Sequence, residues 1–418
     1  MPAPLTEADF PAFPEAQIRL GRLLFYDKIL SGNRNISCGA CHVGRLGGSD
    51  GLSLGIGEGG DGLGRERTAG TGGQRISARV PRNAPGLWNL GHPDFTALFR
   101  DGRVEVADTY GNRFDTPAEE FLPGGLASVL AAQALFPMIS GVEMAGDRGE
   151  NDVIVAVFDR PDKGWRVIER RLRGIAAYGD LFARAFDDID GAGDITIAHV
   201  ANALAAYQAT AFRSLDSPFD AYLREGTPLP PAAGRGRRLF YGKAGCATCH
   251  SGPLMTDQRY HALGLPAFGP GRTRRHDPMP RDVGRMGASD RLEDAYRFRT
   301  PSLRNVALTA PYGHNGAWPT LEGMIRQHLN PAKARKAWRP EMAILPPAPW
   351  IAWRDVVIRE DRREMARQAR ATEIDLPALS DAEIADLVAF LNALTGRDAR
   401  AAPPEPPARV PSGLPVTR

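Results

Sequence analysis

All four cysteines of this 418-residue chain lie in two short motifs with the same pattern, C-x-x-C-H. The motifs are Cys38-Gly-Ala-Cys41-His42 and Cys246-Ala-Thr-Cys249-His250. This pattern is typical of covalent haem c attachment, in which two thiols add to the haem vinyl groups and the following histidine binds the iron. The sequence therefore predicts two c-type haems.

Three other interpretations of a C-x-x-C pair compete with haem attachment: a zinc site, a redox disulfide, and coincidence. Zinc sites usually combine two such pairs at closer spacing or add an H-x-x-x-H segment. A redox motif needs a thioredoxin-like βαβ setting, which the pattern around these cysteines does not indicate. No cysteine remains for a structural disulfide, so haem attachment is the favoured interpretation.

The segment that precedes each motif is repeated within the chain. Residues 21–28 read GRLLFYDK and residues 236–243 read GRRLFYGK, and in the first copy the intervening stretch LSGNRNIS lengthens the approach to the cysteines. Internal repeats of this kind indicate duplicated structural units. Each copy predicts a helix followed by a haem-binding loop, and each opens a cytochrome c-like helical domain.

Helical periodicity organises much of the remaining chain. Apolar residues at helical spacing predict a helix over 194–213, and Ser380 with Glu383 forms a capping box at the start of a final helix. The Gly-rich stretch 51–73 is expected to be a long loop. We therefore predict an all-α fold of two cytochrome c-like haem domains with long loops. The expected divisions are an N-terminal segment 1–14, a first haem domain 15–216, a linker 217–233, a second haem domain 234–398, and a Pro-rich disordered tail 399–418.

Charge and hydropathy exclude some classes of protein. The net charge of +3 and the pI of about 8.7 give no concentrated basic surface, so a nucleic-acid partner is not expected. No apolar run reaches the roughly 18 residues that a membrane span needs. The first 20 residues show no basic stretch followed by an apolar one. Because haem c is attached outside the bacterial cytoplasm, we nevertheless expect an exported protein whose signal was removed or precedes this start.

Several segments, in order, resemble the bacterial dihaem cytochrome c peroxidase and MauG superfamily. They are LGRLLFYDKILSGNRNISCGACH, PRNAPGLWNLG, FRDGR, QALFPMISGVEM, GRRLFYGKAGCATCH and FRTPSLRNVALTAPYGHNGAWPTLEGMIRQHLNP. Together they extend the resemblance over nearly all of residues 15–398. The resemblance implies two all-α haem domains with a calcium ion between them. It also implies an N-terminal haem that reacts with peroxide and a C-terminal haem that relays electrons.

The resemblance assigns further roles to individual residues. Glu143 matches a family glutamate on the distal side of the first haem, where a carboxylate can move a proton between the two peroxide oxygens. Gln133 matches a family glutamine expected to help position the reacting groups. The implied calcium ligands are the side chain of Asn83 and the carbonyl oxygens of Thr309 and Pro311, which are oxygen donors suited to a hard cation.

The second axial ligand of the C-terminal haem differs among members of the family, which use Met, Tyr or His there. The matching position is His328, and Met324, His314 and Tyr312 are the alternatives. Two histidine ligands would give a saturated, electron-transferring haem of lower potential than a Met-ligated one. The remaining histidines are expected to be structural or exposed: His92, His199, His261 and His276.

Two positions depart from the family pattern. Some peroxidases carry a histidine that ligates the first iron in the resting state, but no histidine lies between His42 and His92, and the matching position falls near Arg75. The first haem is therefore expected to be open. The family often has a tryptophan between the haems, in the segment F-W-D-G-R, whereas this chain has Arg100 there. Electrons would then pass through Trp88 or directly between the haems. The segment between Arg103 and Gln133 is also longer than in compact peroxidases.

Three functions follow from these observations. The leading prediction is a peroxidase that reduces hydrogen peroxide with electrons from a small redox protein. The alternative is a MauG-like enzyme that oxidises tryptophan or other residues of a partner protein, and a non-catalytic dihaem electron carrier is the third. Family relatives are often dimers, so the resemblance also raises the possibility of a homodimer.

Overall fold

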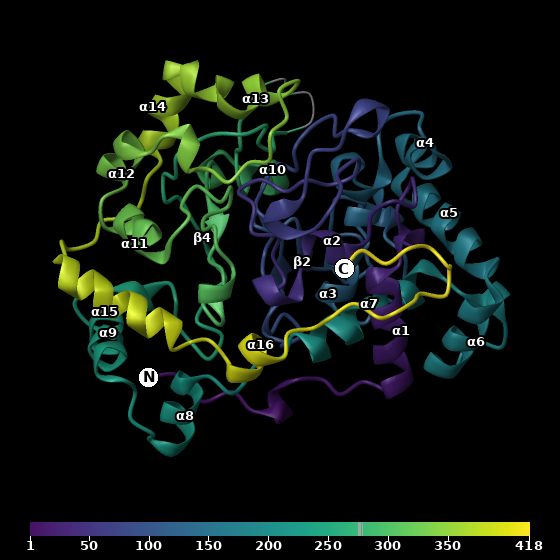
Figure 1. Ribbon diagram of the computed structural model, residues 1–418, viewed down its shortest axis with the longest axis horizontal. Helices are drawn as coiled ribbons and strands as arrows, with labels where there is room; N and C mark the ends of the chain where they lie inside the picture. The colour runs from purple at the N-terminus through teal and green to yellow at the C-terminus, as the bar shows by residue number, and fades with distance from the viewer. Residues whose placement is uncertain (275–276, 278) are drawn as a thin grey trace.

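The computed structural model describes residues 1–274, 277 and 279–418, and its helices gather into two lobes that lie side by side (Figure 1). The first lobe contains α1 (Glu15–Tyr26), α2 (Cys38–Cys41), α3 (Val129–Ala134), α4 (Asp152–Asp159), α5 (Pro161–Arg173), α6 (Ala176–Ala185) and α7 (Ile197–Ala211). The second is built on α8 (Pro218–Glu225), α9 (Pro231–Tyr241), α10 (Met286–Ser289), α11 (Leu321–Leu329), α12 (Pro331–Ala337), α13 (Ala352–Val356), α14 (Arg362–Arg370) and α15 (Asp381–Asn392), and α16 (Arg397–Ala401) follows.

Short strands add two small antiparallel sheets to this mostly helical fold. One sheet has the order β1 (Ala97–Leu98), β2 (Val104–Val106), β3 (Phe114–Asp115), with Leu98 opposite Val104. The other pairs β4 (Tyr260–His261) with β5 (Phe298–Arg299). The prediction of a mostly helical chain is therefore confirmed. Within the part of the chain that it describes, the structure adds five short strands that the all-α prediction did not include.

The repeated sequence segment forms the same helix pair in each lobe. In the first lobe α1 packs on α7, and in the second α9 packs on α15. The repeat begins with a glycine because the two backbones nearly touch at that point. A Cβ on Gly21 would lie 1.9 Å from the carbonyl oxygen of Ala203, and one on Gly236 would lie 1.9 Å from that of Asp386. No larger residue fits this crossing without separating the helices.

Aromatic residues of the repeat fill both helix pairs. In the first lobe the ring centroids of Phe25 and Tyr207 are 5.3 Å apart, and in the second those of Phe240 and Phe390 are 5.2 Å apart. Edge-to-face contacts at this distance stabilise a core beyond the effect of burial alone. The duplication inferred from sequence thus reappears as duplicated packing.

The two helices predicted from periodicity form close to their expected ends. The helix expected over 194–213 is α7, and Thr196 caps its first turn. The capping box at Ser380 is confirmed, because the Ser380 hydroxyl accepts from the Glu383 amide and the Glu383 carboxylate accepts from the Ser380 amide. The expected linker 217–233 is more ordered than predicted, since it contains α8 and buries Phe219.

The Gly-rich stretch 51–73 is a loop, as predicted, yet part of it is buried between the lobes. Leu52, Leu54 and Ile56 are each fully buried. The hydroxyl of Ser53 donates to the carbonyl of Gly316 at 2.7 Å and accepts from the amide of Ile344 at 2.8 Å. This loop therefore joins the two lobes.

The C-terminal tail differs from the disordered segment that its proline content predicted. After α16 it runs without regular structure from the second lobe across the first, and Figure 1 shows it in yellow over α1. Arg22 donates to the carbonyl of Glu405 at 3.1 Å, and the hydroxyl of Ser412 donates to the buried carboxylate of Asp27 at 2.6 Å. Val410 is buried against the first lobe. These contacts offset the chain entropy that would otherwise favour disorder.

Deletion of residues 403–418 is expected to destabilise the first lobe by about 3 kcal/mol. The estimate combines roughly 1.5 kcal/mol for one buried valine and roughly 1.5 kcal/mol for one hydrogen bond to a carboxylate. Thermal unfolding followed by circular dichroism should show a midpoint lower by roughly 6–12 °C. The variant Arg409→Ala, which changes an exposed tail residue, should leave the midpoint unchanged. An unchanged midpoint in the deletion variant would show that the tail does not stabilise the fold.

Within the described residues, no helix has both the length and the apolar character that crossing a membrane requires.

Candidate functional site

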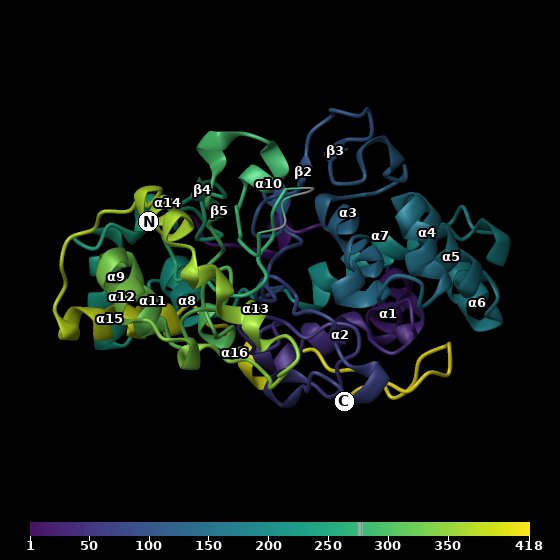
Figure 2. The same ribbon diagram turned by 90° about the horizontal axis from the view of Figure 1, so that it is seen from above.

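A single cavity of about 910 Å³ extends across both lobes and is lined by both C-x-x-C-H motifs. Figure 2 shows the two lobes from above, with α2 in the right-hand lobe and α9 in the left-hand one. The same cavity is also lined by Gln133, Glu143 and His328. The structure therefore brings together every residue that the sequence assigned to haem attachment, iron ligation or catalysis.

His42 is held with one ring nitrogen free. Its Nδ1 lies 2.6 Å from the carbonyl oxygen of Gly48. Because a carbonyl only accepts hydrogen bonds, Nδ1 must carry the proton, and Nε2 of the neutral ring is left with its lone pair. Burial lowers the pKa of His42, which favours this neutral form. Metal-binding histidines commonly donate their second ring N–H in this way.

His250 repeats the arrangement in the second lobe. Its Nδ1 lies 3.2 Å from the carbonyl oxygen of Met255, so Nε2 is again available. In both motifs the histidine amide bonds to the carbonyl of the first cysteine at 3.0 Å, which closes one helical turn over Cys38 and Cys246. This turn presents two thiols and one imidazole to the same space, as haem attachment requires.

The four thiols do not resemble a redox or zinc centre. All four cysteines are free, and burial raises the pKa of Cys38 and Cys41 to about 12. Reactive redox thiols instead have depressed pKa values. Among the described residues the only cluster with metal-ligand spacing is Cys249 with Asp257 and His261, and it omits the other cysteine of its motif. This geometry favours haem attachment over both alternatives.

Glu143 lies in a short π-helical turn, Gly141–Ala145, that faces the first motif. Its charge acts on His42, Cys41 and Arg103, which places the carboxylate at the first motif rather than the second. The neighbouring backbone is tightly packed, since a Cβ on Gly57 would lie 1.9 Å from the carbonyl oxygen of Val142. Close packing of this kind fixes the backbone of Glu143 next to the loop that contains Gly57.

Gln133 lies near the end of α3 and lines the same cavity as Glu143. Arg75, which occupies the position of the resting-state ligand in some relatives, lies elsewhere. Its guanidinium stacks 4.7 Å from the ring centroid of Trp350, and Arg75 is not among the residues that line the cavity. The described residues of this segment thus offer no imidazole to the first iron.

His328 lies near the end of α11 with its Nδ1 2.8 Å from the carbonyl oxygen of Met324, one turn earlier in the same helix. This is the arrangement of His42 and His250, and it leaves Nε2 free. Burial, followed by the nearby charge of His328, lowers the pKa of His250 to about 4. Both imidazoles line the same cavity.

The three alternatives to His328 have other surroundings. His314 stacks on Phe298 with ring centroids 3.6 Å apart and lies among Asp282, Arg82 and Arg100. Met324 packs against the apolar cluster that contains Trp338. The hydroxyl of Tyr312 lies near Arg65 of the first lobe, and burial raises its pKa to about 12.

The remaining histidines fall in varied environments. His92 packs edge-on against Phe10, and His199 caps α7 beside Thr196, as expected of structural residues. His261 lines the cavity, where its Nε2 lies 3.0 Å from the carboxylate of Asp257, so it is nearer the site than predicted. His276 lies outside the described residues.

The three residues assigned to calcium all line the cavity, but Asn83 is already engaged. Its Oδ1 accepts a hydrogen bond from Nη2 of Arg100 at 2.7 Å, and its Nδ2 donates to the carbonyl of Leu52 at 2.8 Å. The oxygen that would bind a cation thus already faces a guanidinium. In this arrangement the residues present do not fit a calcium ion, and no step of the chemistry below depends on one.

Sequence reasoning missed a buried charge network at the junction of the lobes. Arg82 forms a two-point ion pair with Asp282 and reaches Asp101 at 2.7 Å. Burial alone would raise the pKa of Asp101, but Arg103, Arg82 and Arg272 outweigh it and hold that pKa well below its usual range. Buried ion pairs of this kind hold the paired segments in place, because separating the partners would leave an uncompensated charge in the protein interior. The segments PRNAP and FRDGR contained the residues, but sequence gives no sign that they are buried together.

Asp50 is a second residue that the sequence did not reveal. It is fully buried and lines the cavity, and one carboxylate oxygen accepts from the Leu52 amide at 3.0 Å. Burial raises its pKa to about 7. A carboxyl group that titrates near neutral pH beside the first motif can carry a proton, and its position in a Gly-rich loop concealed it.

Comparison with known proteins gives consistent matches. A family model described as di-haem cytochrome c peroxidase matches residues 15–227. The chain is 30% identical over 335 residues to the methylamine utilization protein MauG of Methylorubrum extorquens, which covers 79% of this chain and 73% of that protein. It is 29% identical over 320 residues to cytochrome c551 peroxidase of Pseudomonas aeruginosa, with 76% and 72% covered.

Among solved structures, the chain is similar to a MauG-like protein associated with microbial copper homeostasis. The TM-score is 0.60 at 27% sequence identity, and the match covers 96% of this chain and 95% of that one. Similarity over nearly the full length of both chains means that the two-lobed arrangement, and not only the motifs, is shared.

Proposed function

The chain belongs to the di-haem cytochrome c peroxidase family, and on that premise we propose that it is an exported dihaem peroxidase that reduces hydrogen peroxide. The observation that carries the proposal is the single cavity that contains both attachment motifs and Glu143. Each lobe then serves as one cytochrome c-like haem domain, the first for peroxide chemistry and the second for electron relay. Each turnover converts one peroxide to two waters and consumes two electrons and two protons.

When bound at His42, the haem supplies the iron at which the O–O bond is broken. The role of Glu143 is to accept a proton from one peroxide oxygen and to return it to the other, which becomes the leaving water. Gln133, at the end of α3, orients the peroxide beside this carboxylate. His42 keeps its neutral form through its bond to Gly48, so its Nε2 remains a ligand throughout.

The second lobe is suited to moving electrons. We assign His250 and His328 as the two axial ligands of the second haem, because both keep Nε2 free through Nδ1 bonds to backbone carbonyls. A haem held by both of these side chains would transfer electrons and would leave no site for peroxide. The second haem would accept electrons from a small redox protein, and Trp88, which is buried and lines the cavity, is the residue that would lie on a route to the first haem.

The ferric protein is expected to react with peroxide without prior reduction. The first iron lacks a histidine from the 43–91 segment, and the side chain of Arg75 is stacked on Trp350 instead. Stopped-flow absorption after addition of one equivalent of peroxide should show a change in the Soret band at the same rate for ferric and half-reduced enzyme. A ferric enzyme that responds only after reduction would contradict an open first haem.

Turnover with a reduced c-type cytochrome tests the proposed activity itself. Oxidation of the cytochrome should require peroxide and should consume two reduced cytochromes for each peroxide. A protein that exchanges electrons with the cytochrome but does not respond to peroxide would instead be the non-catalytic carrier.

A MauG-like activity on a partner protein is the second candidate, favoured by the open first haem and by the similarity to MauG. It would use the same cavity but draw its electrons from side chains of the partner. Arg100 counts against it, because a guanidinium cannot be oxidised as the tryptophan of relatives can. The two functions separate when peroxide is added with and without a reduced cytochrome. Peroxide consumption that depends on the cytochrome supports the peroxidase.

Export and self-association remain part of this proposal. Haem c attachment outside the bacterial cytoplasm supports export to the periplasm, and cell fractionation tests it. A homodimer is proposed from family resemblance alone, and analytical ultracentrifugation of the holoprotein tests it.

A further inference from the structure

We propose that the guanidinium of Arg100 takes the place of a metal cation at the junction of the two lobes. The chain would then supply its own interface cation and need no calcium there. This inference concerns the structure of the junction and does not rest on the peroxidase activity.

The first support is the state of Asn83. This residue is 3% exposed, and both ends of its carboxamide are committed, Oδ1 to Arg100 and Nδ2 to the carbonyl of Leu52. The bond to Leu52 fixes the orientation of the amide, because only the nitrogen can donate to a carbonyl. The oxygen therefore points at Arg100 and receives a charge-assisted hydrogen bond of 2.7 Å.

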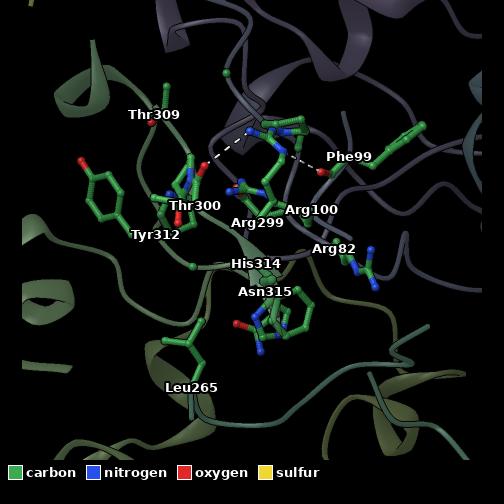
Figure 3. Close-up of a pocket in the computed structure, with 18 of the residues that line it drawn as sticks. Arg82, Phe99, Arg100, Leu265, Arg299, Thr300, Thr309, Tyr312, His314 and Asn315 are labelled. Atoms are coloured by element: carbon green, nitrogen blue, oxygen red, sulfur yellow. Dashed lines mark hydrogen bonds between the residues drawn. The ribbon is translucent and has the colours of Figure 1, made fainter. Parts of the chain in front are cut away.

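The second support is the charge around Arg100. The charged groups that act on it are the cations Arg299 and Arg82, and no carboxylate among the described residues lies within ion-pair distance. Its Nε is buried and has no hydrogen-bond partner among those residues. Figure 3 shows Arg100 and Arg299 in one region of the cavity, with Thr309 and His314 around them. A divalent cation placed here would face like charges on two sides.

The third support is a pair of backbone hydrogen bonds that flank the contact between Arg100 and Asn83. The amide of Arg299 donates to the carbonyl of Arg100 at 2.8 Å, and the amide of Asn83 donates to the carbonyl of His314 at 2.9 Å. Both bonds join segments of the first lobe to segments of the second. The Arg100–Asn83 bond lies within the first lobe and connects the two residues that make these cross-lobe contacts, so one continuous set of hydrogen bonds runs through the junction.

The inference also connects two features that looked separate in the sequence. The chain differs from its family at FRDGR, where Arg100 replaces a tryptophan, and it keeps the asparagine implied in calcium binding. The arginine and the asparagine contact each other directly. Replacement of Arg100 should therefore free the oxygen that a cation needs.

The experiment uses holoprotein dialysed against a chelator and then against buffer with or without calcium. Calcium is counted by mass spectrometry of the metal, and thermal unfolding is followed in parallel. The wild type should retain less than one tenth of an equivalent of calcium, and added calcium should not change its unfolding midpoint. Arg100→Trp and Arg100→Gln should each bind close to one equivalent and unfold at a higher temperature when calcium is present.

Arg299→Gln is the matched control. It removes a guanidinium from the same cavity but leaves Asn83 bonded to Arg100, so it should not gain calcium. One tightly held equivalent in the wild type, whose removal lowers the unfolding midpoint, would overturn the inference. Folded Arg100 variants that bind no calcium would overturn it as well. The wild-type measurement remains decisive if the variants fail to fold.

Discussion

Replacement of Glu143 by glutamine is expected to lower the peroxide turnover number by about 10²–10⁴-fold, the range that a positioned proton-transfer group contributes. Glutamine has nearly the same shape but cannot exchange a proton at neutral pH. The loss should appear in kcat, while binding of a neutral ligand to the first haem should be retained. Steady-state turnover with a reduced cytochrome, together with imidazole binding, separates these two effects.

The matched control is Glu150→Gln, which changes an exposed carboxylate seven residues further along the chain. This variant should keep wild-type turnover, and both variants should keep the wild-type haem absorption spectrum. A Glu143→Gln enzyme within threefold of the wild type would show that another group moves the proton. Asp50 would then be the next candidate, since burial raises its pKa to about 7 and it lines the same cavity.

Replacement of His328 by methionine is expected to raise the reduction potential of the second haem while leaving it low-spin. Methionine can still ligate the iron, and His/Met ligation gives a higher potential than ligation by two histidines. Axial ligands move haem potentials over roughly 0.8 V, so a rise on the order of 0.2 V is expected. Potentiometric titration followed by visible absorption measures it.

His314→Gln provides the contrast, because His314 also lines the cavity but stacks on Phe298. This variant should leave the low-spin haem signal in place. If His328→Met had no effect on potential while His314→Gln converted the second haem to high-spin, the assignment of the sixth ligand would be wrong. The peroxide reaction of the first haem serves as an internal reference in both variants.

The features that the sequence predicted correctly are set by residues close together in the chain. The spacing of Cys38, Cys41 and His42 fits one helical turn, and the structure forms a turn at both motifs. The repeated segments predicted two equivalent helices, and Gly21 and Gly236 show why the repeat keeps a glycine. Family resemblance supplied what spacing could not, namely that Glu143 and His328 lie in the same cavity as the motifs.

What the sequence missed depends on contacts between distant segments. The arginine-rich junction needs segments around residues 82, 101 and 282 to meet, and no local pattern marks an arginine as buried. The tail was expected to be disordered from its proline content, but Ser412 reaches the Asp27 carboxylate, 385 residues away in sequence. The replacement at Arg100 was visible in the sequence, but its bond to Asn83 was not.

We propose that the two haems are unequal: the one at His42 is open, and the one at His250 is closed by His328. The most direct measurement is an EPR spectrum of the resting ferric holoprotein with spin quantitation, repeated after one equivalent of peroxide. We predict one high-spin and one low-spin centre in equal amounts, with loss of the high-spin signal on addition of peroxide. Two low-spin centres in the resting protein, or a high-spin signal that peroxide leaves unchanged, would contradict the account.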